Sequence, residues 1–471
     1  MIYWKVAFIH FERTSCMERN LTIGSIGKAV LVFSVPYLIT YFLQMFYGMA
    51  DLFIVGQYNG VDEITAVAVG SQIMHMATVM LVGLAMGTTV CIARAVGAGD
   101  KERIAQAVGN TSILFFGVSL AATILTLLFL DSIVSLMATP AAAVPGTTSY
   151  LFICFLGIPF ITAYNVISAM FRGLGDTKSP LYFVAVACIL NIALDYFFIG
   201  GMGLGAKGAA YATVLAQASS VLFSLIYIRL RDTGITLKLS CLRPNHAVFR
   251  ELLRVGVPIC MQDAFIQITF IILTIIANSR GLEQAAAVGI VEKLLGFFFL
   301  VPSSMLSAVS ALAAQNLGAE KPDRARGTLN YALGIVITYG LAVGVLMQFF
   351  SPHVLSKFTT DTAVIAMGCD YMGAYIWDVT LGGIQFCYSG YFCAYGISIA
   401  AFIHNAVSSV TVRVPGAYLA VILWPETLMP MGAAAPIGSL LSIIICLFII
   451  RWMKRHPEKL PGFPKVKEES P

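Results

Sequence analysis

Residues 28–60 read KAVLVFSVPYLITYFLQMFYGMADLFIVGQYNG and decide the fold class of this chain. This apolar run exceeds the ~20 residues that a helix needs to cross a bilayer. It contains Pro36 near one end and Asp51 fifteen residues later. A carboxylate at the centre of a bilayer costs about 3 kcal/mol by insertion scales, so it is retained mainly where it has a function. The stretch therefore predicts a membrane-spanning helix with a functional acid.

The composition extends this prediction to the whole chain. Of 471 residues, 58% are hydrophobic and 11% are charged, and the mean hydropathy is +0.85. Soluble domains carry about 25% charged residues, so this chain has too few to cover a water-facing surface. We therefore predict an all-α polytopic protein that lies in the lipid bilayer. The net charge of +5 is spread along the chain, which predicts no nucleic-acid partner.

The cysteines and the N-terminus carry no predicted function. The ten cysteines are scattered singly without CxxC pairs, so neither a disulfide framework nor a zinc site is expected. We expect no cofactor. Residues 1–16 are too short and too interrupted by charge for a signal peptide, and translation can instead start at Met17.

Apolar runs predict twelve spanning helices, six on each side of a polar linker at 229–254. The first six lie near 28–55, 62–90, 104–130, 146–171, 180–199 and 208–228, and the second six near 255–278, 284–314, 327–350, 364–394, 398–423 and 430–452. This pattern divides the chain into an N-terminal segment (1–27), a six-helix lobe (28–228), the linker, a second lobe (255–452) and a tail (453–471).

Lysine and arginine orient the predicted helices. The loops on the side of the two termini contain 24 of the 29 Lys and Arg residues, and the opposite loops contain 3. Lys293 and Arg413 fall inside predicted helices and complete the count. Because cytoplasmic loops are enriched in Lys and Arg, we expect both termini to be cytoplasmic, in a multi-pass protein of the inner (plasma) membrane.

The chain also repeats itself. FSVPYL around Pro36 matches VGVPIC around Pro258, and ARAVGAGDKERIAQAVGN matches AQNLGAEKPDRARGTLN further along. From Gly60 to Gly175 the offset between matching positions stays constant, since Gly60 matches Gly281 and Gly175 matches Gly396. Two parallel six-helix halves of this kind form two bundles around a central cavity, the arrangement used for alternating access.

Two glycine motifs are better explained by turns than by chemistry. Residues 203–208, GLGAKG, fit the dinucleotide-binding pattern GxGxxG, but they lie in a short loop with no strand before them. Residues 173–176, GLGD, resemble the GxGD of intramembrane aspartyl proteases, but Asp176 is followed by Thr-Lys-Ser-Pro in a loop. Such a loop cannot present Asp176 to a second aspartate at membrane depth.

Asp51 and Asp195 are the main candidates for an ion site. Asn191 and Asp195 are four residues apart, so both face one side of a helix. An amide oxygen and a carboxylate on one face can begin a small-cation site that a second carboxylate and a hydroxyl complete. Two carboxylates held close together also favour protonation of one of them. Sodium and proton therefore both remain candidates for the bound ion.

A third intramembrane acid, Asp378, has a competing explanation. Arg413 on the next predicted helix can neutralise it, which would make the pair structural. Glu292 and Lys293 are adjacent and can either face a cavity or pair locally. Each of these charged residues of the second lobe can have either a functional or a purely structural role.

The chain resembles the multidrug and toxic compound extrusion (MATE) family of cation-coupled efflux transporters over residues 20–455. The motifs that carry the resemblance are SVPYLITYFLQMFYGMADLFIVG, ARAVGAGD, FRGLGDTKSP, NIALDYFFIGGMGLGAKGAAYATV, VGVP, AAQNLGAEKPDRA and VRVPGAYL. The resemblance implies two six-helix lobes in a V shape. It also implies export of small organic cations in exchange for Na⁺ or H⁺, by a protein that we expect to be a monomer and not an enzyme.

The resemblance assigns roles to individual residues. It implies a cation-coupling site in the N-terminal lobe, formed by Asp51, Asn191, Asp195 and Thr213. Tyr47 and Tyr150 match tyrosines beside this site, and Pro36 matches a proline at which the first helix is proposed to bend.

One position departs from a second prokaryotic branch of the family. That branch has a glutamate shortly after the proline of helix 7, whereas Pro258 is followed here by ICMQDAFIQ, with Asp263 and Gln267. Asp378 is then the candidate for a site in the second lobe. Two alternative functions remain, a flippase for lipid-linked precursors or polysaccharides and, with less support, an intramembrane aspartyl protease.

Overall fold

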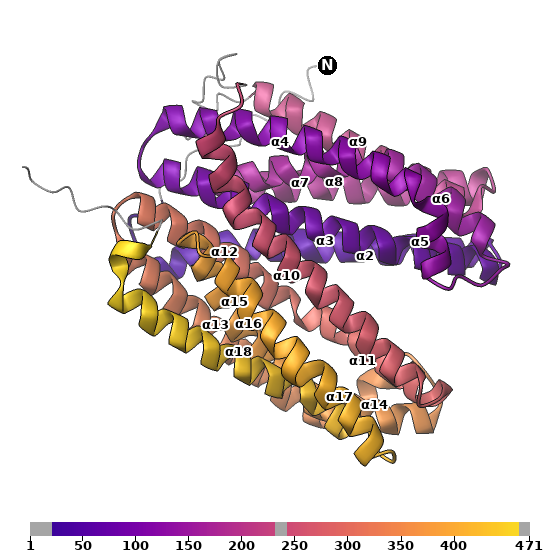
Figure 1. The fold of residues 1–471 in the computed structure, drawn as a ribbon. Helices are drawn as coiled ribbons and strands as arrows, with labels where there is room; N and C mark the ends of the chain where they lie inside the picture. The colour runs from indigo at the N-terminus through magenta and orange to yellow at the C-terminus, as the bar shows by residue number, and fades with distance from the viewer. Residues whose placement is uncertain (1–20, 231–242, 461–471) are drawn as a thin grey trace, which may run out of the picture.

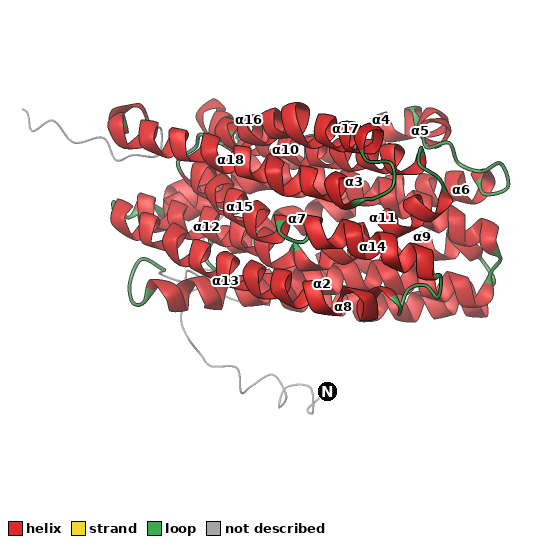
Figure 2. Ribbon diagram, turned by 90° about the horizontal axis from the view of Figure 1, so that it is seen from below, coloured by secondary structure: helices red, strands yellow, loops and turns green. Residues whose placement is uncertain are grey.

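The computed structural model describes residues 21–230 and 243–460. The predicted start at Met17 lies outside these residues. The described chain consists of helices joined by short turns and contains no strand (Figure 2). The elements are α2 (Ile26–Tyr58), α3 (Val61–Gly97), α4 (Lys101–Leu128), α5 (Leu130–Leu136), α6 (Val144–Leu156), α7 (Ile158–Gly173), α8 (Lys178–Asp195), η1 (Tyr196–Gly201), α9 (Gly205–Leu230), α10 (His246–Asn278), α11 (Leu282–Phe298), α12 (Leu300–Gly318), α13 (Pro322–Leu355), α14 (Thr362–Tyr375), α15 (Asp378–Ala394), α16 (Ile399–Ser408), η3 (Ser409–Arg413), α17 (Val414–Leu423), α18 (Met429–Arg455) and η4 (Pro457–Lys459).

The lengths and apolar surfaces of these helices are those of a membrane protein. In the described chain, ten helical segments are long and apolar enough to span a bilayer, and the bent pair α6–α7 makes eleven. The remaining predicted span, 364–394, is divided between α14 and α15. Large apolar side chains lie exposed on the outside, including Phe116, Phe349 and Phe448. Since water would not favour such a surface, the prediction of an all-α polytopic membrane fold is confirmed.

The helices form two bundles that meet at one end and diverge at the other (Figure 1). We call α2–α9 the N-bundle and α10–α18 the C-bundle. The basic end is the end with the turns 98–100, 174–177, 319–321 and 395–398, and the open end carries the turns near α5, α6, α14 and α17. Helix boundaries repeat between the bundles with the offset of the sequence repeat: α3 and α4 begin at Val61 and Lys101, and their counterparts α11 and α13 begin at Leu282 and Pro322.

Close helix packing seals the bundles together at the basic end. A Cβ on Gly97 of α3 would overlap the carbonyl oxygen of Gln315 on α12. The reciprocal contact is also present, because a Cβ on Gly318 would overlap the carbonyl oxygen of Arg94. Gly97 and Gly318 occupy matching positions of the two halves, as do Arg94 and Gln315, so the seam has the symmetry of the repeat. Arg94 adds a cross-bundle bond, donating from Nε and Nη2 to the carbonyl oxygen of Ala394 at 3.1 and 2.6 Å.

Helix α10 begins earlier than predicted, at His246 rather than at residue 255. The side chain of Asn245 accepts a hydrogen bond from the backbone N–H of Ala247 at 2.9 Å and caps the helix. A prediction from hydropathy places the helix boundary where charged residues begin, although the helix itself can continue beyond the membrane into water. The correction moves Arg250, Glu251 and Arg254 from a predicted linker onto a helix.

Both glycine motifs form turns in the structure, as the sequence predicted. Gly203, in the connection between η1 and α9, and Gly205, the first residue of α9, have φ values of +66° and +54°, which only glycine adopts readily. Asp176 lies in the turn between α7 and α8, where its Oδ1 accepts hydrogen bonds from the backbone N–H groups of Lys178 and Ser179 at 2.9 and 3.1 Å. These contacts give Asp176 a capping role.

Candidate functional site

The N-bundle brings the predicted ion-site residues together. Asp51 comes from the last third of α2, Asn191 and Asp195 from the end of α8, and Thr213 from α9. The Thr213 hydroxyl donates a hydrogen bond to Asp51 Oδ2 at 3.3 Å. Asp195 and Asn191 also lie close enough to interact with the Asp51 carboxylate. Four side chains from three helices therefore surround one point inside the bundle.

Most of the oxygens at this point have no partner. Asp51, Asn191 and Asp195 are 3%, 1% and 0% exposed. Oδ1 of Asp51, both carboxylate oxygens of Asp195 and both polar atoms of the Asn191 amide make no hydrogen bond. Buried polar groups are nearly always satisfied in folded proteins, so a cluster of unsatisfied oxygens marks a place for a positively charged group.

The carboxylates of Asp51 and Asp195 also have no ion-pair partner in the described chain.

The helix type changes at Asp195, because α8 ends there and the π-helical segment η1 follows. Such segments widen a helix locally and are frequent at functional sites. Nothing in the apolar pattern of residues 180–199 indicated this irregularity.

The three supporting residues differ in their distance from the carboxylates. The Tyr47 hydroxyl, one turn before Asp51, accepts a hydrogen bond from Gln217 Nε2 at 3.3 Å. The Tyr150 hydroxyl bonds Ser71 Oγ at 3.1 Å, and its ring packs where a side chain on Gly70 would lie. Pro36 lies about 22 Å along the helix from Asp51 by helical rise, so the structure does not bring it to this cluster.

A buried arginine near Pro36 was missed by the sequence analysis. Arg172 was counted with a loop, yet it lies in the last turn of α7 and is 4% exposed. Its guanidinium lies 5.0 Å from the ring centroid of Tyr37, whose hydroxyl donates to the Tyr41 hydroxyl at 2.8 Å. Because a glycine-rich turn follows Arg172, the sequence predicted an exposed loop residue. No local sequence pattern indicates that Arg172 is buried.

The C-bundle acid Asp378 is part of a buried ion pair. Arg413 Nη2 lies 3.5 Å from Asp378 Oδ2, and it donates a hydrogen bond to Ser439 Oγ at 2.5 Å. The Ser439 hydroxyl in turn donates to Asp378 Oδ1 at 2.5 Å. Of the two explanations given for Asp378, the structure therefore contains the ion pair with Arg413. Asp378 is placed away from Asp51 and Asp195, in the other bundle.

The remaining charged candidates are separate from one another. Lys293 is exposed, and Glu292 is half-buried and accepts a hydrogen bond from Thr274 Oγ1 at 3.4 Å. Asp263 lies on α10 against α3, where a Cβ on Gly83 would come within 2.5 Å of its Oδ2. None of them forms an ion pair within residues 21–230 and 243–460.

Comparison with known proteins places this architecture in a family. The MatE family model matches residues 36–197 and, a second time, residues 258–419. The two matched segments begin at Pro36 and Pro258, one in each bundle. The chain belongs to the MatE (MATE) family. MATE proteins are multidrug transporters and not enzymes, and this chain is a multi-span membrane protein of that family.

Curated MATE relatives cover most of the chain. The probable multidrug resistance protein YoeA of Bacillus subtilis is 27% identical over 89% of this chain and 87% of its own length. The multidrug export protein MepA of Staphylococcus aureus is 25% identical over 81% and 85%. Among solved structures, a MOP superfamily transporter from Pyrococcus furiosus superposes with a TM-score of 0.88 at 25% identity, covering 95% of this chain and 100% of that one.

Breaking the buried ion pair of this MATE protein should destabilise it. We expect Arg413→Met to lower stability by about 3 kcal/mol, because it leaves the Asp378 carboxylate buried without its partner. Combining Arg413→Met with Asp378→Asn should restore most of the loss, since the uncompensated charge is then gone. Thermal unfolding of the purified chain in detergent measures both effects.

Lys293→Met removes an exposed cation and should leave the unfolding temperature nearly unchanged. Additive losses in the Arg413 and Asp378 double variant would contradict a coupled pair.

Proposed function

We propose that this MATE protein is a secondary antiporter that exports amphipathic, cationic organic compounds in exchange for H⁺ or Na⁺. It would work as a monomer in the plasma membrane, with its basic end and both termini in the cytoplasm. The relatives named as multidrug export and resistance proteins support the substrate class. The excess of Lys and Arg at one end supports the orientation.

One observation carries the coupling part of the proposal, namely the unsatisfied oxygens of Asp51, Asn191 and Asp195 inside the N-bundle. The nearby Thr213 hydroxyl adds a fourth polar group. Carboxylate, amide and hydroxyl oxygens are ligands that small hard cations prefer. The same carboxylates can take up protons instead. Either ion would relieve the repulsion between two buried carboxylates that lack a basic partner.

Transport follows when the ion and the drug favour different conformers. The structure is closed at the basic end and diverges at the open end (Figure 1). Ion uptake from the open end would stabilise a conformer that then opens to the cytoplasm, and drug binding would return the protein to the present one. A ligand shifts such an equilibrium only by its difference in affinity for the two states, so the ion and the drug need not share contacts.

The coupling ion can be identified by dye efflux from right-side-out membrane vesicles or proteoliposomes. The Na⁺ gradient and the pH gradient are imposed separately, and efflux of an ethidium-type cation is followed by fluorescence. We expect one of the two gradients to drive efflux and the other to have little effect.

The vesicles need two controls. A protonophore should stop only proton-driven efflux, and vesicles without the protein should show none. Efflux that is independent of both gradients would contradict antiport. Transport of a lipid-linked sugar but not of the dye would favour the flippase alternative.

A further inference from the structure

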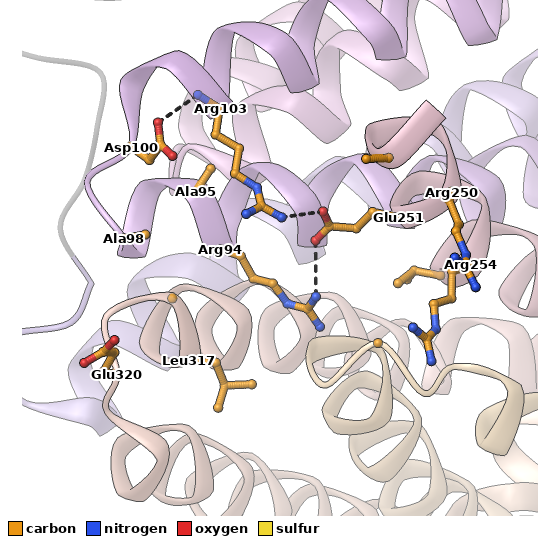
Figure 3. A pocket seen from close by; sticks show the side chains of 14 residues that line it. Arg94, Ala95, Ala98, Asp100, Arg103, Arg250, Glu251, Arg254, Leu317 and Glu320 are labelled. Carbon is orange, nitrogen blue, oxygen red and sulfur yellow. Dashed lines mark hydrogen bonds and ion pairs between the residues drawn. The ribbon is translucent and has the colours of Figure 1, made fainter. Parts of the chain in front are cut away.

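A cavity at the basic end lies between the two bundles and is lined by arginines (Figure 3). It has a volume of about 500 Å³ and is formed by α3, α4, α10 and α12 together with Gly396. Four arginines and three acids line it. Because α3 and α4 belong to the N-bundle and α12 to the C-bundle, the cavity exists only while the basic end is closed.

The acid at the centre of the cavity is already neutralised. Glu251 of α10 pairs with Arg94 through Oε1 at 3.2 Å and with Arg103 through Oε2 at 2.7 Å. Arg94 also donates to the carbonyl oxygen of Ala394. Two of the four arginines therefore have anionic or carbonyl acceptors from the protein itself, and their positions are fixed.

The other two arginines, Arg250 and Arg254, form no ion pair in the described part of the chain. They are exposed and lie on the same side of Glu251 in Figure 3, away from Asp100 and Glu320. Two guanidinium groups one helical turn apart repel each other unless an anion lies between them. Arginine is well suited to bind phosphate because its planar donors match the phosphate oxygens.

An apolar stripe continues from these arginines along the same face of α10. Val257 and Met261 follow Arg254 at spacings of three and seven residues, which keeps them on one face of the helix. Both are large exposed apolar side chains, 41% and 46% exposed, and Leu253 beside them is 36% exposed. The face is therefore cationic at the basic end and apolar farther into the membrane.

We propose that Arg250 and Arg254 bind the phosphate headgroup of an anionic phospholipid, whose acyl chain follows the apolar stripe of α10. The order of charge and apolar surface along the helix matches the order of headgroup and hydrocarbon in a leaflet. Basic clusters at the cytoplasmic ends of spanning helices attract anionic lipids in this way. A free phosphate would use the two arginines but would have no use for Leu253, Val257 and Met261.

The site also links lipid binding to conformation. Its phosphate-binding arginines lie beside Glu251, which bridges α10 to α3 and α4 across the closed basic end. A lipid bound there stabilises the conformer in which the cavity is formed. Anionic lipid should consequently favour the state that is open at the other end.

The test uses the purified full-length chain and measures its unfolding temperature during titration with phosphatidylglycerol in phosphatidylcholine–detergent micelles. A ligand that binds the folded state raises this temperature in a saturable way. We expect saturable stabilisation of the unaltered chain. In the double variant Arg250→Ala/Arg254→Ala, the half-saturating lipid concentration should rise by roughly tenfold or more.

A matched control removes two other charges from the same end. Lys454→Ala/Arg455→Ala changes two exposed cations in the last turn of α18, outside the cavity, and should keep the response of the unaltered chain. Without phosphatidylglycerol, all three proteins should unfold at similar temperatures, which shows that the arginine variant is folded.

Three outcomes would overturn the proposal in whole or in part. Equal weakening in both double variants would mean a diffuse attraction between the lipid and the basic end. Stabilisation by inorganic phosphate, with competition against phosphatidylglycerol at similar concentrations, would mean that the arginines bind soluble phosphate rather than a lipid. A variant Val257→Ser/Met261→Ser that keeps the full lipid response would show that the apolar stripe has no part in binding.

Discussion

Replacing Asp51 or Asp195 by asparagine is expected to reduce drug efflux to the level of vesicles without the protein. An amide cannot take up a proton, and it cannot balance the charge of a bound cation. The two carboxylates lie in one buried cluster with Asn191, and each substitution leaves only one of them. Resistance of a drug-sensitive host and dye efflux from vesicles both measure the effect.

The same substitutions should not destabilise the protein. An ionised carboxylate without a basic partner costs on the order of 3 kcal/mol in the membrane, and Asp195 has no ion pair to lose in the described chain. We therefore expect the unfolding temperature of Asp195→Asn to stay the same or to rise. Loss of transport together with preserved or increased stability separates a functional role from a structural one.

Asp131→Asn serves as the matched control, because Asp131 is an exposed acid of the same bundle. It should transport normally. The assignment of the ion site fails if Asp51→Asn or Asp195→Asn retains most of its efflux at normal abundance in the membrane.

Adding a methyl group at Gly97 or Gly318 should open the seam at the basic end. In each case the new Cβ would overlap a backbone carbonyl oxygen of the facing helix, and a backbone atom cannot move aside as a flexible side chain can. An effect on the order of 3 kcal/mol shifts a two-state equilibrium roughly hundredfold. We expect Gly97→Ala and Gly318→Ala to depopulate the conformer described here and to reduce transport by about tenfold or more.

The expected loss of the described conformer is opposite to the effect that helix propensity alone would have. Alanine in place of glycine inside a helix normally stabilises it by up to about 1 kcal/mol. Gly117 of α4 and Gly334 of α13 provide this comparison, because nothing lies within 4 Å of a Cβ at either position. Gly117→Ala and Gly334→Ala should therefore be neutral or stabilising.

Spin labels on Ala141→Cys and Thr360→Cys, two exposed positions at the open end of the two bundles, report the conformer. The distance between them should shorten in the seam variants and stay unchanged in the controls. An unchanged distance in both seam variants would contradict the role given to the glycines.

Much of the N-bundle site could be predicted from the sequence because its signal is local. A carboxylate in an apolar helix is costly wherever it occurs, which singles out Asp51 and Asp195. The four-residue spacing of Asn191 and Asp195 already places both on one helix face. Thr213 needed the family resemblance, since a threonine in an apolar helix has no signal of its own.

The parts that were missed depend on contacts between distant segments. Glu251 and Arg94 are far apart in the sequence, and hydropathy assigned Glu251 to a linker because the bilayer pattern ends before the helix does. Arg172 looked exposed because a turn follows it. For Asp378 the sequence offered both a site and a pair with Arg413, and only the distance between them distinguishes the two.

The unequal charges of the two bundles limit the stoichiometry of transport. The Asp378 carboxylate is balanced by Arg413, whereas Asp51 and Asp195 are balanced by no basic residue of the described chain. Uptake by the Asp51 and Asp195 pair alone would carry at most two protons in each cycle. Exchange of one proton for a monovalent drug is electroneutral. Exchange of two protons is electrogenic, and the membrane potential then adds about 2.3 kcal/mol per 100 mV to the driving force.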